Sequence, residues 1–134
     1  MSVSIKQIVG SIVSQVETQT LARVTRASVA LKNASLEVLS GPRSGRSYRK
    51  PNGGTYIASA PGEPPASRTS TLMGSFRPLQ ADPHTAAIET SVPYAAMLES
   101  GTGRMAPRPY RQKVIEKAMP AIEQILNEPY GIGI

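Results

Sequence analysis

The chain has 134 residues, a formal net charge of +6 and no cysteine. The lack of cysteine excludes disulfides, thiolate metal sites and cysteine nucleophiles, and no apolar run approaches the roughly 20 residues that a membrane-spanning helix needs. The length fits a single domain, 1–134, with a modest core. No signal peptide is recognisable, so we expect a soluble protein made in a cytoplasm, without a membrane partner.

The N-terminal quarter of the chain, residues 1–35, predicts one long amphipathic helix. Gly10 should cost this helix about 1 kcal/mol relative to alanine, so its helicity must come mainly from packing. Its apolar residues recur at spacings of three and four; they are Ile5, Ile8, Val9, Ile12, Val13, Val16, Leu21, Val24 and Leu31.

Residues 36–60 predict extended structure. The alternation in SLEVLS, residues 35–40, is typical of a strand. A hairpin then follows, with arms at 45–49 and 55–60. Its turn at 50–54 contains Asn-Gly-Gly, residues that tolerate positive φ, and we expect Tyr48 and Tyr56 to pack together.

Residues 61–70 contain three prolines and predict an ordered arm. Residues 71–128 then predict short helices, a strand and a C-terminal helix. Thr69 or Ser70 is a suitable cap for the first short helix, whose apolar side is Leu72, Met73 and Phe76. We expect Arg77-Pro78 to end that helix, a turn at 81–84 and a strand at 85–91.

The stretch 92–111 predicts a short helix, a glycine stop, a basic loop and the start of the last helix. Pro93 suits a first helical position, and Gly101 suits the left-handed position that follows a helix. The last helix is expected over 109–127, with a kink or a break into two helices at Pro120. Residues 129–134 read as a flexible tail.

Candidate catalytic groups are sparse. The single histidine, His84, lies in a proline turn, and one histidine without cysteine makes a zinc site improbable. Residues 47–50 match the S-x-x-K string of serine acyl-enzymes without its companion motifs. The G-x-G at 101–103 lacks the strand and helix of a phosphate loop. We therefore expect no enzymatic activity, no metal and no cofactor.

Two groups of basic residues leave several interpretations open. The first group lies on the hairpin and consists of Arg43, Arg46, Arg49 and Lys50. It has three possible roles: a solvated charged face, a contact with an acidic subunit surface, or a contact with a phosphate backbone. The second group is Arg104, Arg108 and Arg111. These residues either contact a partner or hold their loop in place by bonding neighbouring carbonyls and Glu99.

Two stretches together carry a family resemblance. Residues 60–66, APGEPPA, followed by Thr69, Leu72 and Ser75, resemble the PGEPPA…T…L…S segment of a phage virion family. Residues 92–110, VPYAAMLESGTGRMAPRPY, resemble the same family's YA..LE.GT..M..RPF signature. The chain thus resembles the tail-completion, or head–tail joining (minor head–tail connector), proteins of long-tailed bacteriophages. It departs from them at Tyr110, where phenylalanine is usual, and at 70–71, where Thr-Gly is common.

The resemblance implies an α+β fold, in which a small twisted antiparallel sheet is flanked by a long N-terminal helix and a C-terminal helix, as in tail terminators. It implies a structural virion protein, made in the host bacterial cytoplasm, that forms a ring, usually of six copies, in the phage neck. The ring's partners would be further copies, the tail tube or terminator, and the head-side connector or stopper proteins. The alternatives are a basic nucleic-acid-binding module, a tail terminator or another minor tail component.

On this interpretation the residues of the two stretches contact neighbouring subunits. Arg43, Arg46, Arg49 and Lys50 then face an acidic partner or the ring lumen, where contact with DNA would be weak and independent of sequence. The candidate subunit-interface residues are Pro61, Glu63, Pro64, Pro65, Tyr94, Leu98, Glu99, Arg104, Met105, Arg108 and Tyr110.

Overall fold

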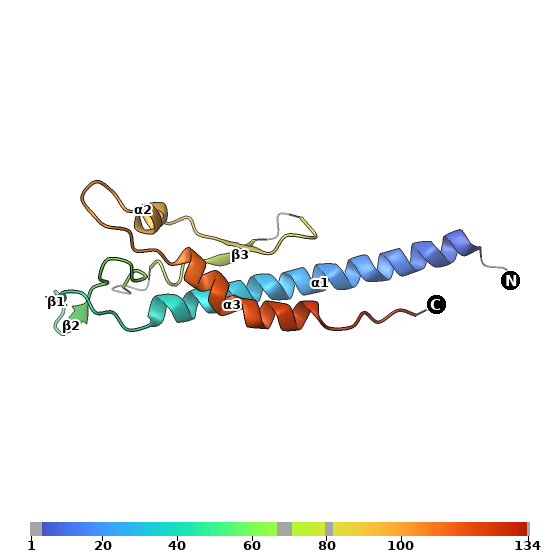
Figure 1. The fold of residues 1–134 in the computed structure, drawn as a ribbon, viewed down its shortest axis with the longest axis horizontal. Helices are drawn as coiled ribbons and strands as arrows, with labels where there is room; N and C mark the ends of the chain where they lie inside the picture. Colours follow the sequence, from blue (N-terminus) through green and yellow to red (C-terminus); the bar gives the residue numbers. More distant parts are fainter. Residues whose placement is uncertain (1–3, 67–70, 80–81, 134) are drawn as a thin grey trace.

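The computed structural model describes residues 4–66, 71–79 and 82–133. The elements are α1 (Ile5–Ser40), β1 (Ser47–Arg49), β2 (Thr55–Ile57), β3 (Arg77–Leu79), β4 (Ala87–Glu89), α2 (Ala95–Ser100) and α3 (Arg111–Leu126). The molecule is elongated: α1 runs along its length, α3 lies beside α1, and β1–β2 forms the end opposite the two chain termini (Figure 1). The α+β class is confirmed.

Helix α1 ends five residues later than predicted. It starts at a capping box in which Ser4 and Gln7 bond each other's backbone N–H groups, and it ends at Ser40. The strand predicted at 35–40 is wrong. Ser35 and Leu39 are buried at helical spacing from Ala27 and Leu31, so the same residues that alternate also continue the buried stripe of the helix.

Within the described residues, the β structure consists of two separate two-stranded sheets rather than one. The β1–β2 hairpin is confirmed, with Tyr48 opposite Tyr56 and their rings stacked 5.5 Å apart. The predicted strand at 85–91 is present as β4, which pairs with β3. The short helix predicted around Leu72 is instead a series of turns, and Arg77-Pro78 starts a strand. The predicted caps at 69 and 70 lie outside the described residues.

In the turn at 72–75 both the backbone N–H and the side chain of Ser75 bond the Leu72 carbonyl. The Ser75 hydroxyl donates to the Leu72 carbonyl and also lies 2.6 Å from the Thr90 hydroxyl. The turn therefore is linked to the segment after β4, while Leu72 and Phe76 remain buried.

The two later helices follow the prediction with adjusted starts. Helix α2 begins at Ala95, two residues after Pro93, and Gly101 follows it with φ +77° and ψ 176°. The positive φ is as predicted, whereas the ψ is extended rather than left-handed helical. Helix α3 is one continuous helix through Pro120, so the predicted break is wrong. Its axis does change direction partway along, as the kink prediction requires (Figure 1).

The core lies where α1, α3, α2 and the turn before β3 meet. Many of its side chains are small, which allows α1 and α3 to approach closely. The buried cluster is Ala34, Leu39, Leu72, Phe76, Ala95, Tyr110, Val114 and Ala118. The flexible tail predicted for 129–134 is instead, over 129–133, an extended segment bound to α1.

Candidate subunit-contact surface

An apolar groove of about 520 Å³ opens between the hairpin, the arm and α2. Leu39 and Leu72, both core residues, line it from the side of the core. Five of the predicted interface residues line the same groove: Pro65, Tyr94, Leu98, Met105 and Arg108. The two sequence stretches that carry the family resemblance therefore meet in space.

Hydrogen bonds hold the arm against the loop before α3. The Gly62 N–H donates to the Pro107 carbonyl at 3.1 Å, and the Lys113 ammonium donates to the Gly62 carbonyl at 3.0 Å. Arg108 donates from Nε to the Ser59 hydroxyl at 2.9 Å. The wall of the groove is thus fixed by bonds between segments about 50 residues apart.

Glu63 shapes the arm from within. Its carboxylate accepts from the Ala60 N–H at 2.6 Å and from both the N–H and the hydroxyl of Ser44. These bonds, that from Ala60 first, hold the pKa of Glu63 below its ordinary value. Of the neighbouring prolines, Pro61 is exposed and Pro64 is half-buried. The arm is therefore an ordered loop over its described residues.

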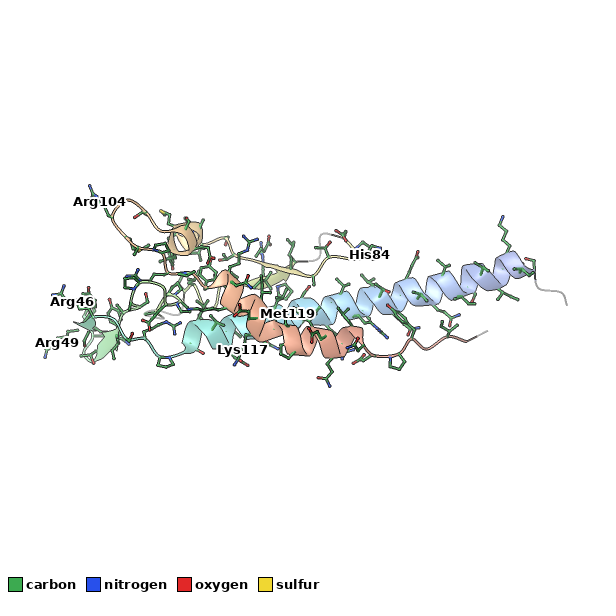
Figure 2. The ribbon with its side chains drawn as sticks, in the orientation of Figure 1. Arg46, Arg49, His84, Arg104, Lys117 and Met119 are labelled. Atoms are coloured by element: carbon green, nitrogen blue, oxygen red, sulfur yellow. The ribbon has the colours of Figure 1, made fainter. Side chains whose placement is uncertain are left out.

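The loop after α2 is equally constrained. The Gly101 N–H closes α2 by donating to the Met97 carbonyl at 2.8 Å, and Thr102 and Met105 exchange two backbone bonds. The Arg108 N–H then donates to the Leu98 carbonyl at 2.7 Å. These bonds turn the chain back, so that Met105 lines the groove while Arg104 points away from the body of the molecule (Figure 2).

Glu99 and Tyr110 serve the subunit's own fold. The Glu99 carboxylate accepts from the N–H groups of Tyr110 and Arg111 at 2.9 and 3.1 Å, which caps the positive end of α3. The Tyr110 hydroxyl donates to the Ala95 carbonyl, and its ring meets Phe76 edge to face. Tyr110 is only 8% exposed, and burial raises its pKa. Tyr110 therefore offers little surface to a second chain, whereas Glu99 is half-buried.

Arg43 differs from the other three basic residues of the hairpin region. Its guanidinium folds back onto the chain and donates to the carbonyls of Val38, Gly41 and Pro65 at 2.7 to 3.0 Å. It therefore closes the end of α1. Lys50 is half-buried, whereas Arg46 and Arg49 are exposed.

Three of the exposed arginines gather at one end of the molecule. Arg46 and Arg49 on the hairpin and Arg104 on the loop after α2 all lie at the end away from the chain termini (Figure 2). Tyr94, the N-cap residue of α2, is 40% exposed, and Met97 on α2 is also exposed. The sequence led us to propose Tyr94, but not Met97, as an interface residue. Tyr56 and Met73 also line the groove, and no local pattern in the sequence indicated this.

The remaining candidates of the sequence lie apart from this surface. His84 is in an exposed turn, where the Asp82 carboxylate accepts from its N–H and from the Thr85 hydroxyl. Within 4–66, 71–79 and 82–133, no three His, Asp or Glu side chains gather as a metal site would require. Among the same residues, no helix has the length and apolar composition that crossing a bilayer demands.

Comparison of the chain with protein-family models, with curated proteins and with solved structures found no match.

Proposed function

We propose that this chain is a structural protein of a tailed-phage virion, without enzymatic activity, whose copies form a ring in the neck that completes the tail and joins it to the head connector. The resemblance of 60–66 and 92–110 to the tail-completion proteins is the basis of the proposal. Six copies, and partners in the tail tube and the head-side connector, follow from the same resemblance.

One observation supports the proposal most directly. The two stretches that resemble the family are linked by the Gly62–Pro107 hydrogen bond and line one apolar groove. Tyr94 at the start of α2 and Met97 on α2 are exposed, and Tyr94 also lines that groove. Aromatic and methionine side chains around an apolar recess are typical of protein interfaces. A groove of this kind that accepts a different surface of the next copy gives a head-to-tail contact, which closes into a ring.

The test changes an exposed residue, so that the fold of the isolated subunit is kept. Tyr94→Asp places a charge at the edge of the groove, and loss of a buried interface tyrosine costs about 2 kcal/mol or more. A phage that carries this substitution should make filled heads and complete tails that stay separate, as counted by electron microscopy of the lysate.

Met119→Asp is the matched control, because Met119 is similarly exposed but lies on α3 (Figure 2). This variant should give joined particles. Normal joining in Tyr94→Asp, or equal loss in both variants, would contradict the role proposed for the groove.

A second candidate function is contact with nucleic acid, and the grouping of Arg46, Arg49 and Arg104 at one end favours it (Figure 2). In a ring these arginines would meet the passing DNA, whereas a free-standing binding module would use them alone. Phosphate contacts of this kind are independent of sequence and weaken steeply with salt.

The double variant Arg46→Gln/Arg49→Gln distinguishes the two candidates. If the isolated chain binds duplex DNA through these residues, the slope of log K against log salt should fall by about two. Lys6→Gln, at the other end of the molecule, should leave the slope unchanged. Tight duplex binding by the isolated monomer would favour the binding module, and its absence would leave the structural role as the better account.

A further inference from the structure

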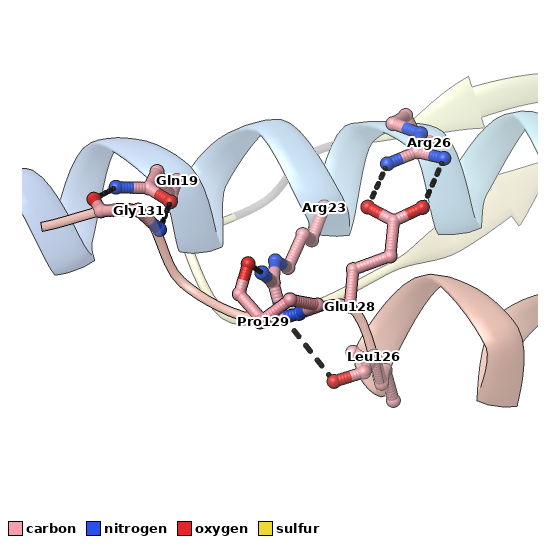
Figure 3. Close-up of polar contacts among 7 residues, drawn as sticks. All are labelled: Gln19, Arg23, Arg26, Leu126, Glu128, Pro129 and Gly131. Atoms are coloured by element: carbon pink, nitrogen blue, oxygen red, sulfur yellow. Dashed lines mark hydrogen bonds and ion pairs between the residues drawn. The ribbon is translucent and has the colours of Figure 1, made fainter.

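Three side chains of α1 hold the extended segment 129–133, which we call the strap. The Gln15 amide donates to the Gly133 carbonyl at 2.7 Å and accepts from the Gly133 N–H at 2.8 Å. The Gln19 amide makes the same pair of bonds with Gly131, and Arg23 donates to the Pro129 carbonyl at 3.0 Å. Figure 3 shows the second and third of these contacts.

The spacing of the contacts explains why a helix can hold a strand in this way. The three side chains are four residues apart on α1, and their partners are two residues apart on the strap. Four residues of helix rise about 6.0 Å, and two residues of strand rise about 6.6 Å. The mismatch of about 0.6 Å per contact is small enough for long side chains to absorb over three contacts.

The recognition is directed mainly at the backbone. Each glutamine presents a carbonyl and an N–H₂ to the N–H and carbonyl of a single residue, as the peptide group of a neighbouring strand would. Side-chain recognition comes from Tyr130, whose ring lies 3.9 Å from the Arg23 guanidinium and whose hydroxyl is 2.8 Å from that of Thr20. The surface of α1 formed by Gln15, Gln19, Thr20 and Arg23 is thus built to bind an extended peptide.

The strap is held differently from the helix that precedes it. Helix α3 buries Val114, Ala118 and Ile125, whereas the bonds of Gln15 and Gln19 to the strap are exposed to solvent. Solvent-exposed hydrogen bonds contribute little net free energy, because water replaces them. Residues 131–133 of the strap should therefore open first, while α3 stays in place and Pro129, bonded to the buried Arg23, opens last.

We propose that this surface of α1 is a peptide-docking site and that the strap of a second copy of this chain occupies it when copies associate. Each copy carries both the site and the matching peptide, so an exchange between copies can re-form the bonds of Gln15, Gln19 and Arg23 to the strap, together with the Arg26–Glu128 ion pair beside it. Which strap occupies the site then depends on the effective concentration, at that site, of the strap of the same chain relative to that of a neighbouring copy. This inference goes beyond the proposed function and holds whether or not the assembly is a phage neck.

The chain's lack of cysteine allows a direct test by crosslinking. One preparation carries Gln19→Cys and the other, isotopically labelled, carries Gly131→Cys; in each variant the Gln15 and Arg23 contacts remain. The two are mixed at high concentration and oxidised. Mass spectrometry should find disulfides between the two introduced cysteines at least about tenfold above those in a mixture with Gln112→Cys, the control on α3.

A measurement on the unmodified chain guards against a folding defect in the variants. Labelled and unlabelled wild-type chains are mixed, and isotope-filtered NOEs are recorded between the side-chain amide of Gln15 and the Hα atoms of Gly133. Intermolecular NOEs support strap exchange. Their absence where the intramolecular NOEs are present, or disulfide yields equal to the control, would overturn it and leave the strap as a closure within one subunit.

Discussion

Gly101 occupies a backbone position that strongly disfavours every other residue type. Its φ is +77°, and a Cβ there would lie 2.9 Å from the Met105 carbonyl oxygen and from Pro107. We expect Gly101→Ala to lower the free energy of unfolding by about 2 kcal/mol or more, because both the conformation and the contacts oppose it.

Gly103→Ala is the control for this prediction, since a Cβ at Gly103 meets nothing within 4 Å and its φ is not positive. Chemical denaturation should show a clear loss for the first variant and a change within about 0.5 kcal/mol for the second. Equal midpoints would mean that the loop after α2 does not adopt this path in solution.

Glu63 should make the fold sensitive to acid. Its three accepted hydrogen bonds lower its pKa below the ordinary value of about 4.3. A carboxyl with a lower pKa in the folded chain stabilises the fold above its unfolded pKa, and that contribution is lost as the pH falls through the folded value. The free energy of unfolding should therefore fall between about pH 5 and pH 3.

Glu63→Gln should flatten part of this fall, because the amide does not titrate. Glu128, whose pKa is lowered by its hydrogen bonds from Arg26, should supply a remaining part. Urea unfolding of both proteins across this pH range measures the difference. Parallel profiles for the two would show that the carboxylate does not hold the arm.

At the scale of elements, Gly10 offers a test of α1 itself. A Cβ at this position meets nothing within 4 Å, and the residue lies inside the helix. Gly10→Ala should stabilise the helix by about 1 kcal/mol and raise the melting temperature by about 3 °C. Unchanged melting and helix content by circular dichroism would mean that the first turns of α1 are not formed in the folded chain.

What the sequence predicted at this scale depended on local rules. The β1–β2 hairpin followed from the glycines of its turn, and Gly53 and Gly54 do adopt positive φ. The prediction of a strand at 35–40 was wrong because a short alternation of apolar residues fits a helix as well as a strand. In the folded chain, Leu39 is buried in a cluster that includes residues of α2 and α3, and this packing favours the helix. The strap was missed because its bonds join residues 112 and 118 positions apart, for which no local pattern exists.

The candidate surface was predictable to a similar extent. Tyr94, Leu98 and Met105 were expected to face a partner and do line the groove. Tyr110 shares their sequence signature but packs into the subunit's own core, and Arg43 shares the charge of the hairpin but bonds carbonyls. The residue type alone does not distinguish a side chain that faces a partner from one that packs or bonds within the subunit, because this depends on the neighbours that the fold places around it.

At the scale of the whole molecule, exposed apolar residues lie at both ends. Ile5 is 80% exposed, and Val9 and Val13 follow it on α1. The β1–β2 hairpin and α2, whose neighbourhood contains the groove, lie towards the other end (Figure 1). Single exposed apolar residues are ordinary, whereas groups of them mark interaction surfaces. Two such regions on one subunit suit an assembly in which each copy has two neighbours.

The most direct test of the proposed role is electron cryomicroscopy of the virion, with this chain located in the density. The account predicts a closed ring of copies between the head connector and the tail tube, with the groove beside Tyr94 filled by a neighbouring chain. A location elsewhere in the particle, absence from it, or a groove open to solvent in every copy would contradict the account.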